Sequence, residues 1–279
     1  MPESMSTLTR TQFDRIARTA KELWGLDLPE KKMALVSSRL AKHTFRNGIN
    51  DVDAFIDHLQ HGASESERLE FFDVLSTNVT SFFREPGAFR CLEQEYFQKL
   101  ENGTLACPDR RLRIWSAACS TGPEPYSIAM TALDALSSPG SWKLDIKATD
   151  LASSVLEIAR RGVYPEEMIE SVDPGILRRY FLRGRADRSG FVRVAQHVRS
   201  VVSFSLLNLM DNWSFSEPFD VIFCRNCMIY FDRETRSRLV DRFHRFLRPG
   251  GLFVIGTSET LAGCKAPFRA IQPAIFARQ

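Results

Sequence analysis

Residues 113–126 join an apolar run, a turn of small residues and the start of a helix. Small side chains from Ala117 to Gly122 let the backbone approach a ligand closely, and Pro123 suits the first turn of a helix. A strand, a small-residue turn and a helix in this order open many nucleotide-binding units, although the G-x-G-x-x-G pattern is absent here. Glu124 then has two interpretations: an acid that the helix dipole favours, or a carboxylate directed at a cationic ligand.

A second acid, Asp150, follows the strand-like residues 144–149. An acid at the carboxyl end of the second strand of such a unit is placed to accept hydrogen bonds from a ribose diol. The same side chain could cap the helix that the composition of residues 152–161 predicts. We favour the ribose, because the first strand and turn of a nucleotide site precede it.

Asn78, Thr80 and Arg84 alternate with bulky apolar residues over 76–86. This pattern fits a ligand-binding loop, but Asn, Thr and Ser also favour caps and turns through local hydrogen bonds. The residues alone leave both interpretations open.

Residues 219–224 are almost continuously apolar, as in a strand buried on both faces of a parallel sheet. The run ends at Arg225 and Asn226, and Tyr230 follows shortly after. Residues 233–247 predict a helix and 252–256 a further buried strand.

The composition is that of an ordinary globular protein, with 279 residues, 44% hydrophobic and 25% charged. No apolar run approaches the ~20 residues that span a bilayer, and no signal peptide is recognisable, so we expect a cytoplasmic protein without membrane insertion. The six cysteines suggest free thiols. Cys224 and Cys227 have redox or zinc spacing, but no second pair completes a metal site, and we expect no metal and two packed thiols.

The net charge of +3 is too small to indicate a partner, and we expect a monomer that binds no nucleic acid. Residues 1–50, however, carry nine Lys or Arg against five Asp or Glu. Apolar spacings of three and four predict helices over residues 9–76. One stripe of the second helix carries four cations, which form either a solvated face or a surface for an acidic partner: Lys32, Arg39, Lys42 and Arg46.

The alternation of strands and helices breaks over 164–204. A short helix around 174–181 and strand-like residues 191–194 and 198–204 indicate a small antiparallel insertion. Residues 268–277 could close the sheet with an edge hairpin. The chain is therefore expected to be an α/β protein with a helical N-terminal domain.

Four separated stretches together resemble the CheR-type chemoreceptor glutamate methyltransferases, and the resemblance covers nearly the whole chain. They are residues 77–85, 115–127, 148–150 with the following helix, and 219–232. It implies a Rossmann-like S-adenosylmethionine-dependent methyltransferase domain over 77–279, a β-subdomain inserted over 164–204, and an all-α domain over 1–76.

The resemblance also implies roles for individual residues. Asn78, Thr80 and Arg84 would close over the cofactor, and Glu124 and Asp150 would hold its amino-acid and ribose portions, in one order or the other. The adenosine side would be lined by Asn208, Leu209, Arg225 and Asn226. Cys119, Pro123 and Cys227 depart from the family pattern.

In this family the basic N-terminal helix is thought to face the acidic coiled coil of the receptor, which would make Lys32, Arg39, Lys42 and Arg46 substrate-binding residues. In some members the β-subdomain docks a peptide at the receptor's C-terminal tail.

The implied chemistry asks little of the protein, because a glutamate carboxylate is ionised at neutral pH and needs no general base. Positioning the reacting atoms and excluding water would supply the catalysis. Tyr230 is a candidate for orienting the substrate or a packed aromatic, and Arg84 could pair with the carboxylate of the cofactor or of the substrate.

Two other functions deserve comparison. A receptor- or regulator-binding module could keep this fold without turnover. A nicotinamide-dependent oxidoreductase would rest only on the generic strand-turn-helix unit and lacks its glycine pattern.

Overall fold

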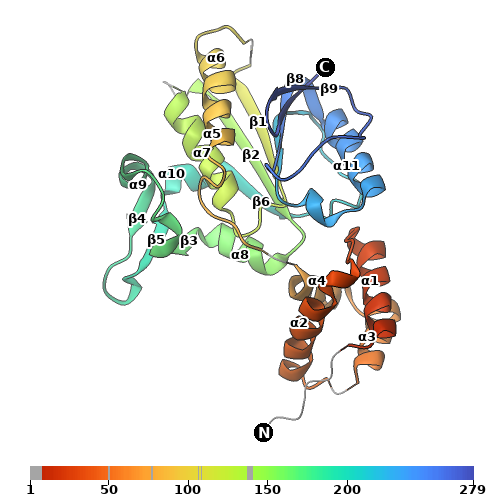
Figure 1. Ribbon diagram of the computed structural model, residues 1–279. Coiled ribbons are helices and arrows are strands. Elements are labelled where there is room, and N and C mark those ends of the chain that lie inside the picture. The colour runs from red at the N-terminus through yellow and green to blue at the C-terminus, as the bar shows by residue number, and fades with distance from the viewer. Residues whose placement is uncertain (1–7, 50, 77, 106, 108, 137–140) are drawn as a thin grey trace.

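The computed structural model describes residues 8–49, 51–76, 78–105, 107, 109–136 and 141–279. The first part is helical, as expected, and lies below the α/β domain in Figure 1. Its helices are α1 (Arg10–Trp24), α2 (Met33–Arg46), α3 (Val52–His61) and α4 (Glu65–Leu75), with a 3-10 turn over Glu30–Lys32.

Local capping explains where these helices begin. Thr9 and Ser64 each accept a hydrogen bond from the amide three residues later, and the side chains of Gln12 and Glu67 reach back to the capping amides. Such capping boxes satisfy two of the amides that a helix start leaves unpaired. Asp51 caps α3 in the simpler way, through the amide of Ala54.

The α/β domain is built on a seven-stranded sheet in the order β6-β2-β1-β7-β8-β10-β9. The strands are β1 (Arg111–Ala117), β2 (Lys143–Asp150), β6 (Val202–Leu206), β7 (Phe219–Cys224), β8 (Leu247–Ile255), β9 (Phe268–Gln272) and β10 (Ile275–Arg278). The first five in spatial order are parallel, and β10 pairs antiparallel with both β8 and β9. The predicted α/β class and the edge hairpin are confirmed.

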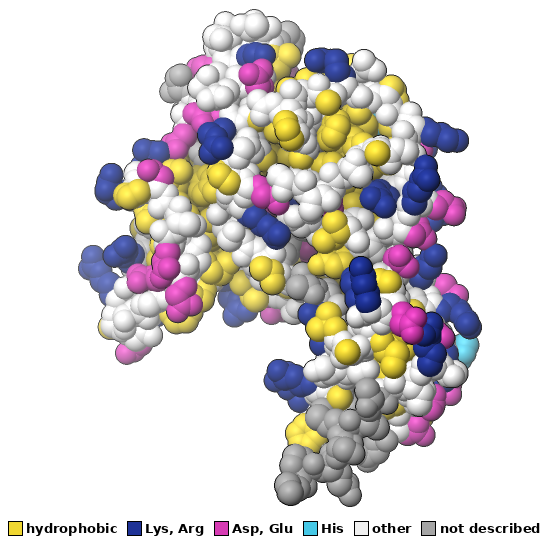
Figure 2. Space-filling model, in the orientation of Figure 1, with side chains coloured by type: hydrophobic (Ala, Val, Ile, Leu, Met, Phe, Trp, Pro, Cys, Tyr) yellow, Lys and Arg dark blue, Asp and Glu magenta, His cyan; other side chains and the backbone are white. Residues whose placement is uncertain are grey.

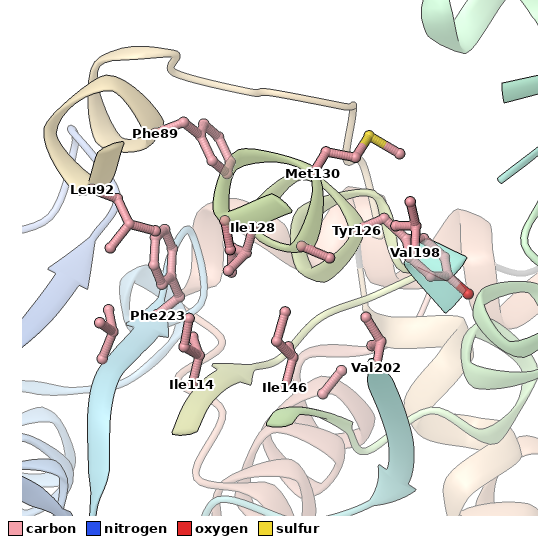
Figure 3. Close-up of a cluster of buried hydrophobic side chains, with 14 of the residues drawn as sticks. Phe89, Leu92, Ile114, Tyr126, Ile128, Met130, Ile146, Val198, Val202 and Phe223 are labelled. Atoms are coloured by element: carbon pink, nitrogen blue, oxygen red, sulfur yellow. The ribbon is translucent and has the colours of Figure 1, made fainter. Parts of the chain in front are cut away.

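Helices cover the sheet on both faces, and alternate strand residues point to opposite sides. Figure 3 shows Ile114 and Ile146 facing α7 (Pro123–Ala135), whose Ile128 packs against them. On the other face Trp115 and Phe253 pack against α11 (Arg233–Phe246) in a core shared with the N-terminal helices. The remaining helices of the sheet domain are α5 (Gly87–Cys91), a π-helical turn over Leu92–Phe97, α6 (Gln98–Glu101) and α8 (Ser153–Arg161).

The insertion is a three-stranded antiparallel sheet in the order β3-β5-β4, and it projects to one side in Figure 1. Its elements are β3 (Val163–Pro165), α9 (Pro174–Tyr180), β4 (Phe181–Arg183), β5 (Phe191–Val194) and α10 (Gln196–Arg199), with 3-10 turns over Glu166–Ile169 and Ala186–Arg188.

The strand expected over 198–204 is wrong in its start and in its partner. Val198 lies in α10, and the strand begins at Val202, where it pairs in parallel with β2. The last residues of the expected insertion 164–204 therefore belong to the main sheet. Alternation of apolar and polar residues is the same in an edge strand of either sheet, so the pattern did not identify the partner.

The N-terminal helices are tied to the sheet domain by backbone and side-chain contacts. The amide of Asp27 donates to the carbonyl of Tyr230 at 2.7 Å, and Leu26 forms an isolated bridge with Phe231. The Lys21 ammonium lies 2.8 Å from the Asp232 carboxylate. These contacts hold the end of α1 and the loop after it against residues 230–232, shortly beyond β7.

Within the described ranges, no helix is long and apolar enough to cross a membrane.

Candidate functional site

A cavity of about 330 Å³ lies at the carboxyl ends of β1, β2 and β7, between the sheet domain and the N-terminal helices. Trp24, Leu26 and Leu209 contribute apolar wall from both sides. The cavity is lined by all nine residues expected to bind the cofactor: Asn78, Thr80, Arg84, Glu124, Asp150, Asn208, Leu209, Arg225 and Asn226. Side chains from five separated stretches of sequence thus meet at one place.

Residues 78–86 form one wall of the cavity rather than only a helix-capping linker. The ring of Phe82 is buried against the insertion, 5.1 Å from the ring of Phe181. The amide of Phe83 donates to the Ser127 hydroxyl at 2.9 Å. Arg84 folds back within the loop, where its guanidinium donates to the Val79 carbonyl at 2.9 Å.

The turn after β1 forms the floor of the cavity. Ala118 and Ser120 have φ angles of 59° and 51°, and Gly122 has 99°. At Gly122 a Cβ atom would lie 2.9 Å from the Cβ of Ala159 and from the Tyr164 hydroxyl, so only glycine fits. The chain therefore turns sharply into α7 close under the cavity.

Asp150 is held at the end of β2 by backbone amides. Its carboxylate accepts from the amide of Ser120 at 2.7 Å and from that of Ala152 at 3.0 Å. Burial raises the pKa of Asp150, and these amides oppose the rise. Ala152 is the N-cap residue of α8, so Asp150 does not cap that helix by the usual geometry. The side chain lines the cavity and keeps lone pairs for a ligand.

Arg225 joins two carboxylates beneath the cavity. Its guanidinium lies 3.1 Å from Glu124 and 3.0 Å from Glu85, and only 2% of its side chain is exposed. It also donates to the carbonyl of Arg84 at 2.7 Å, which anchors the loop before α5. Arg225 therefore holds parts of the site together through these contacts, and little of its side chain is open to a ligand.

Glu124 lies in the first turn of α7, where the helix dipole favours an acid, and it also lines the cavity. Besides Arg225, the Ser116 hydroxyl donates to it at 2.7 Å. Burial raises the pKa of Glu124 against the opposing effect of Arg225. Burial also favours a higher pKa for Glu85, but the hydrogen bond from the Thr257 amide and the ion pair with Arg225 bring that pKa below its usual value. The more exposed carboxylate is the more readily ionised of the pair.

Glu85 and Glu259 are site residues to which the sequence analysis gave no role. Glu259 accepts from the amides of Asn226 at 3.0 Å, Gly256 at 2.6 Å and Ile229 at 3.2 Å. It thereby holds Asn226 in a left-handed conformation with φ of 56°. An acid just beyond the end of a buried strand was the available signal for Glu259.

Asn208 is occupied by the protein. Its amide group donates to the Leu23 carbonyl at the end of α1, and its oxygen accepts from the Met210 amide, both at 3.0 Å. Leu209 beside it is 8% exposed. Asn208 thereby connects this wall of the cavity to the N-terminal domain.

Lys32 and Tyr230 contact each other, and both side chains line the cavity. Tyr230 is half-buried, and the Lys32 ammonium lies 4.8 Å from the centre of its ring, a cation–π distance. Burial, followed by repulsion from Lys31, lowers the pKa of Lys32. Both side chains line the cavity, Lys32 from the N-terminal domain and Tyr230 from the sheet domain.

The other three cations of the predicted stripe separate into two environments. Arg39 is half-buried and donates to the carbonyls of Leu75 and Ser76 at the end of α4, each at 2.8 Å. Lys42 and Arg46 are exposed and lie outside the cavity.

The cysteines of the described chain are free thiols. Cys224 is fully buried at the end of β7, and contact with Cys227 and burial raise its pKa well above the usual value. Cys119 and Cys227 line the cavity. In the described ranges, no group of three or more His, Cys, Asp and Glu side chains has an arrangement that could hold a metal.

The donor set fits S-adenosylmethionine, which offers an ammonium, a carboxylate, a ribose diol and an apolar purine. Asp150 suits a diol, Glu124 an ammonium and Arg84 a carboxylate, because each presents the complementary charge or lone pairs at the cavity. The apolar walls suit the purine.

Comparisons with known proteins agree with this geometry. The family model for the all-alpha domain of CheR methyltransferases matches residues 11–76, and that for their SAM-binding domain matches residues 78–276.

Three relatives match over almost their whole length. Chemotaxis protein methyltransferase 2 of Pseudomonas aeruginosa is 38% identical over 271 residues, covering 96% of this chain and 93% of that protein. The chemotaxis protein methyltransferase of Salmonella typhimurium is 36% identical, covering 97% and 91%. That of Borreliella burgdorferi is 36% identical, covering 96% and 94%. The chain belongs to the CheR methyltransferase family.

Proposed function

We propose that this protein methylates glutamate side chains on the cytoplasmic helical domain of chemoreceptors, giving glutamate methyl esters for sensory adaptation. Membership of the CheR family and the names of the relatives support methylation in chemotaxis. The observation that carries the proposal is the cavity itself, which combines a ligand-binding floor from the sheet domain with a wall from a basic helix. Since the proposed substrate is cytoplasmic, we place the protein there as well.

When bound, S-adenosylmethionine would supply an activated methyl group on its sulfonium for transfer to a carboxylate oxygen of the substrate, with S-adenosylhomocysteine as the leaving product. Asp150 would hold the ribose hydroxyls, Glu124 the ammonium, and Arg84 a carboxylate. Tyr230 would orient the substrate glutamate, because it lines the cavity on the side of the N-terminal domain. No side chain needs to remove a proton, since the attacking carboxylate is already ionised at neutral pH.

Water exclusion is the second contribution of the protein. Trp24, Leu26 and Phe72 from the N-terminal helices line the cavity opposite the polar floor. A substrate helix that covers the opening would leave the reacting atoms in a dry, fixed geometry, which favours transfer in line.

The test uses the purified protein, labelled methyl donor and receptor cytoplasmic fragments. We expect methyl groups on the receptor that are released by mild base, as glutamate esters are. Label that survives base would assign another acceptor. Calorimetry that shows no donor binding, together with receptor binding, would favour the non-catalytic module instead.

We also propose that the insertion docks the receptor's C-terminal tail. The edge strand β4 and its neighbour β5 border a surface with exposed Phe191 and with Arg183, Arg185 and Arg188. An exposed strand edge can add an extended peptide as a further strand, and three arginines suit an acidic one. Receptor fragments with and without their tails should differ in affinity for the wild type, and Arg185→Glu with Arg188→Glu should remove that difference.

A further inference from the structure

Cys224 and Cys227 contact each other at the end of β7. Within a strand, residues three positions apart lie about 10 Å from each other, because each residue advances the chain by about 3.3 Å. Here Asn226 has a φ of 56°, a left-handed conformation, and the chain bends between the two cysteines. The bend brings the two sulfur atoms together, so the folded protein holds a pair of neighbouring thiols.

The two thiols differ in how firmly the fold holds them. Cys224 is fully buried and is the last residue of β7, where it lies opposite Ala117 of β1 and Ile255 of β8. Cys227 is half-buried, lies beyond the strand and lines the cavity. A bond between the two sulfur atoms would therefore be accommodated by movement of Cys227, because neighbouring strands fix Cys224 on both sides.

Cys227 is also the thiol that a small oxidant in solution reaches first. Figure 2 shows that the molecule is hollowed between the N-terminal domain and the insertion, and Cys227 is the partly exposed member of the pair. Contact with Cys227, followed by burial, raises the pKa of Cys224 well above its usual value, so Cys224 stays protonated. Since thiolates rather than thiols attack peroxides, Cys227 is the attacking sulfur and Cys224 the resolving one.

We propose that Cys224 and Cys227 form a reversible disulfide, with a peroxide as the oxidant, and that this disulfide weakens the binding of S-adenosylmethionine. The proposal goes beyond methyl transfer and does not depend on which protein is methylated. It concerns a residue at which this chain departs from its family, since Cys227 lies outside the family pattern.

The reaction has two steps. The Cys227 thiolate attacks one oxygen of hydrogen peroxide, the oxygen–oxygen bond breaks, and hydroxide leaves, which gives a sulfenic acid. The Cys224 sulfur then attacks the Cys227 sulfur, the sulfur–oxygen bond breaks, and the hydroxyl group leaves as water with the Cys224 proton. The two thiols lose two electrons, and the peroxide is reduced to two molecules of water. A dithiol reductant reverses the change by thiol–disulfide exchange.

The disulfide acts on the cavity through the loop after β7. Bonded sulfur atoms lie about 2.05 Å apart, closer than two non-bonded sulfur atoms can lie. Residues 225–227 must therefore shift toward Cys224. Asn226 and Cys227 both line the cavity, and Glu259 holds the Asn226 amide at 3.0 Å, so the shift moves one wall and disturbs the contact that supports it.

Peptide mapping and calorimetry test the proposal on the whole protein. Trypsin cuts after Arg225, between the two cysteines, so a disulfide joins two separate peptides. After treatment with hydrogen peroxide we expect this linked pair and about tenfold weaker binding of S-adenosylmethionine, equivalent to ~1.4 kcal/mol. Dithiothreitol should reverse both. A linked pair with unchanged affinity would overturn the proposal, as would sulfinic acid at Cys227 without any linked pair.

Variants identify the responsible thiol. Cys227→Ser should bind S-adenosylmethionine with the same affinity before and after peroxide treatment. Cys264→Ser is the matched control, because Cys264 is also half-buried but lies outside the cavity, and it should keep the full response of wild type. If Cys227→Ser still lost affinity, another thiol such as Cys119 would be responsible and the proposal would be wrong.

A second test needs only the wild type. If the disulfide weakens binding of the methyl donor about tenfold, linkage requires that saturating donor favour the dithiol form by the same factor. In buffers that contain oxidised and reduced dithiothreitol, the equilibrium constant for disulfide formation should fall about tenfold when S-adenosylmethionine is added. An equilibrium constant that does not respond to the donor would contradict the proposed coupling.

Discussion

At the scale of single residues, the site is a set of carboxylates whose environments differ. Asp150 is held by backbone amides, Glu124 is paired with Arg225, and Glu259 holds the backbone of the loop after β7. Buried acids of this kind keep their position because each has donors in the protein. Of the two that line the cavity, Asp150 and Glu124, only Glu124 has an ion pair within the described ranges, so Asp150 is the freer to bind a ligand.

Replacing Asp150 should therefore weaken ligand binding while leaving the fold intact. We expect Asp150→Asn to weaken S-adenosylmethionine binding by about 10- to 100-fold, because the amide keeps the shape but loses charge and one acceptor. Calorimetry measures the affinity, and circular dichroism checks the fold. Asp145→Asn, a half-buried acid at the other end of β2, is the control. An unchanged dissociation constant would remove Asp150 from the binding site.

Asp232 gives a pH-dependent contribution to stability. Its carboxylate pairs with Lys21 and caps α11 through the Thr235 amide, and these contacts lower its pKa to about 2. Because the folded pKa lies below the unfolded one, the stabilisation is present above the ordinary pKa of 3.8 and is lost as pH falls toward 2. Asp232→Asn keeps a capping side chain and removes the ion pair. The free energy of unfolding of Asp232→Asn should be lower than that of wild type at pH 6, and this difference should be smaller at pH 3. A difference that stays constant between pH 6 and pH 3 would show that the ion pair does not cause it.

At the scale of elements, the sequence predicted which segments are helices and strands better than how side chains pair between them. Apolar spacing identified α2 and a continuous apolar run identified β7, and the predicted strand-end residues Asp150, Arg225 and Asn226 line the cavity. The partners of Arg225 were not predictable, since Glu124 lies 101 positions away and only the sheet order brings them together.

The stripe of cations on α2 also shows that contacts between elements could not be predicted from the sequence. Charge and periodicity treated Arg39 and Lys42 alike, but only Arg39 meets the end of α4. An unpaired helix end offers carbonyls to any nearby cation, and nothing in the pattern of one helix reveals a neighbouring helix end.

Substitutions of Arg39 and of Lys42 should therefore differ in their effect on the free energy of unfolding. We expect Arg39→Met to lower the free energy of unfolding by about 1–3 kcal/mol, because it leaves part-buried carbonyls at the end of α4 without this charged donor. Lys42→Met should change stability by less than about 0.5 kcal/mol, as is usual for exposed positions. Chemical denaturation of both variants measures this. If Lys42→Met were the more destabilised, the assignment of the two cations would be reversed.

At the scale of the whole molecule, cations occur at two depths. Arg225 is buried beneath the cavity with its carboxylates, and Lys42 and Arg46 are exposed at the outer end of α2. Salt screens exposed charges over roughly 10 Å at 0.1 M but acts much less on buried pairs. The proposed cofactor and the proposed receptor should therefore respond differently to ionic strength.

Between 50 and 300 mM salt we expect the receptor-fragment affinity to fall several-fold, while S-adenosylmethionine affinity changes less than about twofold. The double variant Lys42→Ala with Arg46→Ala should bind receptor more weakly at low salt and lose most of the salt dependence, because the screened charges are gone. Its affinity for the methyl donor should equal that of wild type. Two results would contradict contact between the outer end of α2 and an acidic receptor surface. One is an equal salt dependence of the affinities for the receptor fragment and for S-adenosylmethionine. The other is an equal salt dependence of receptor affinity in wild type and double variant.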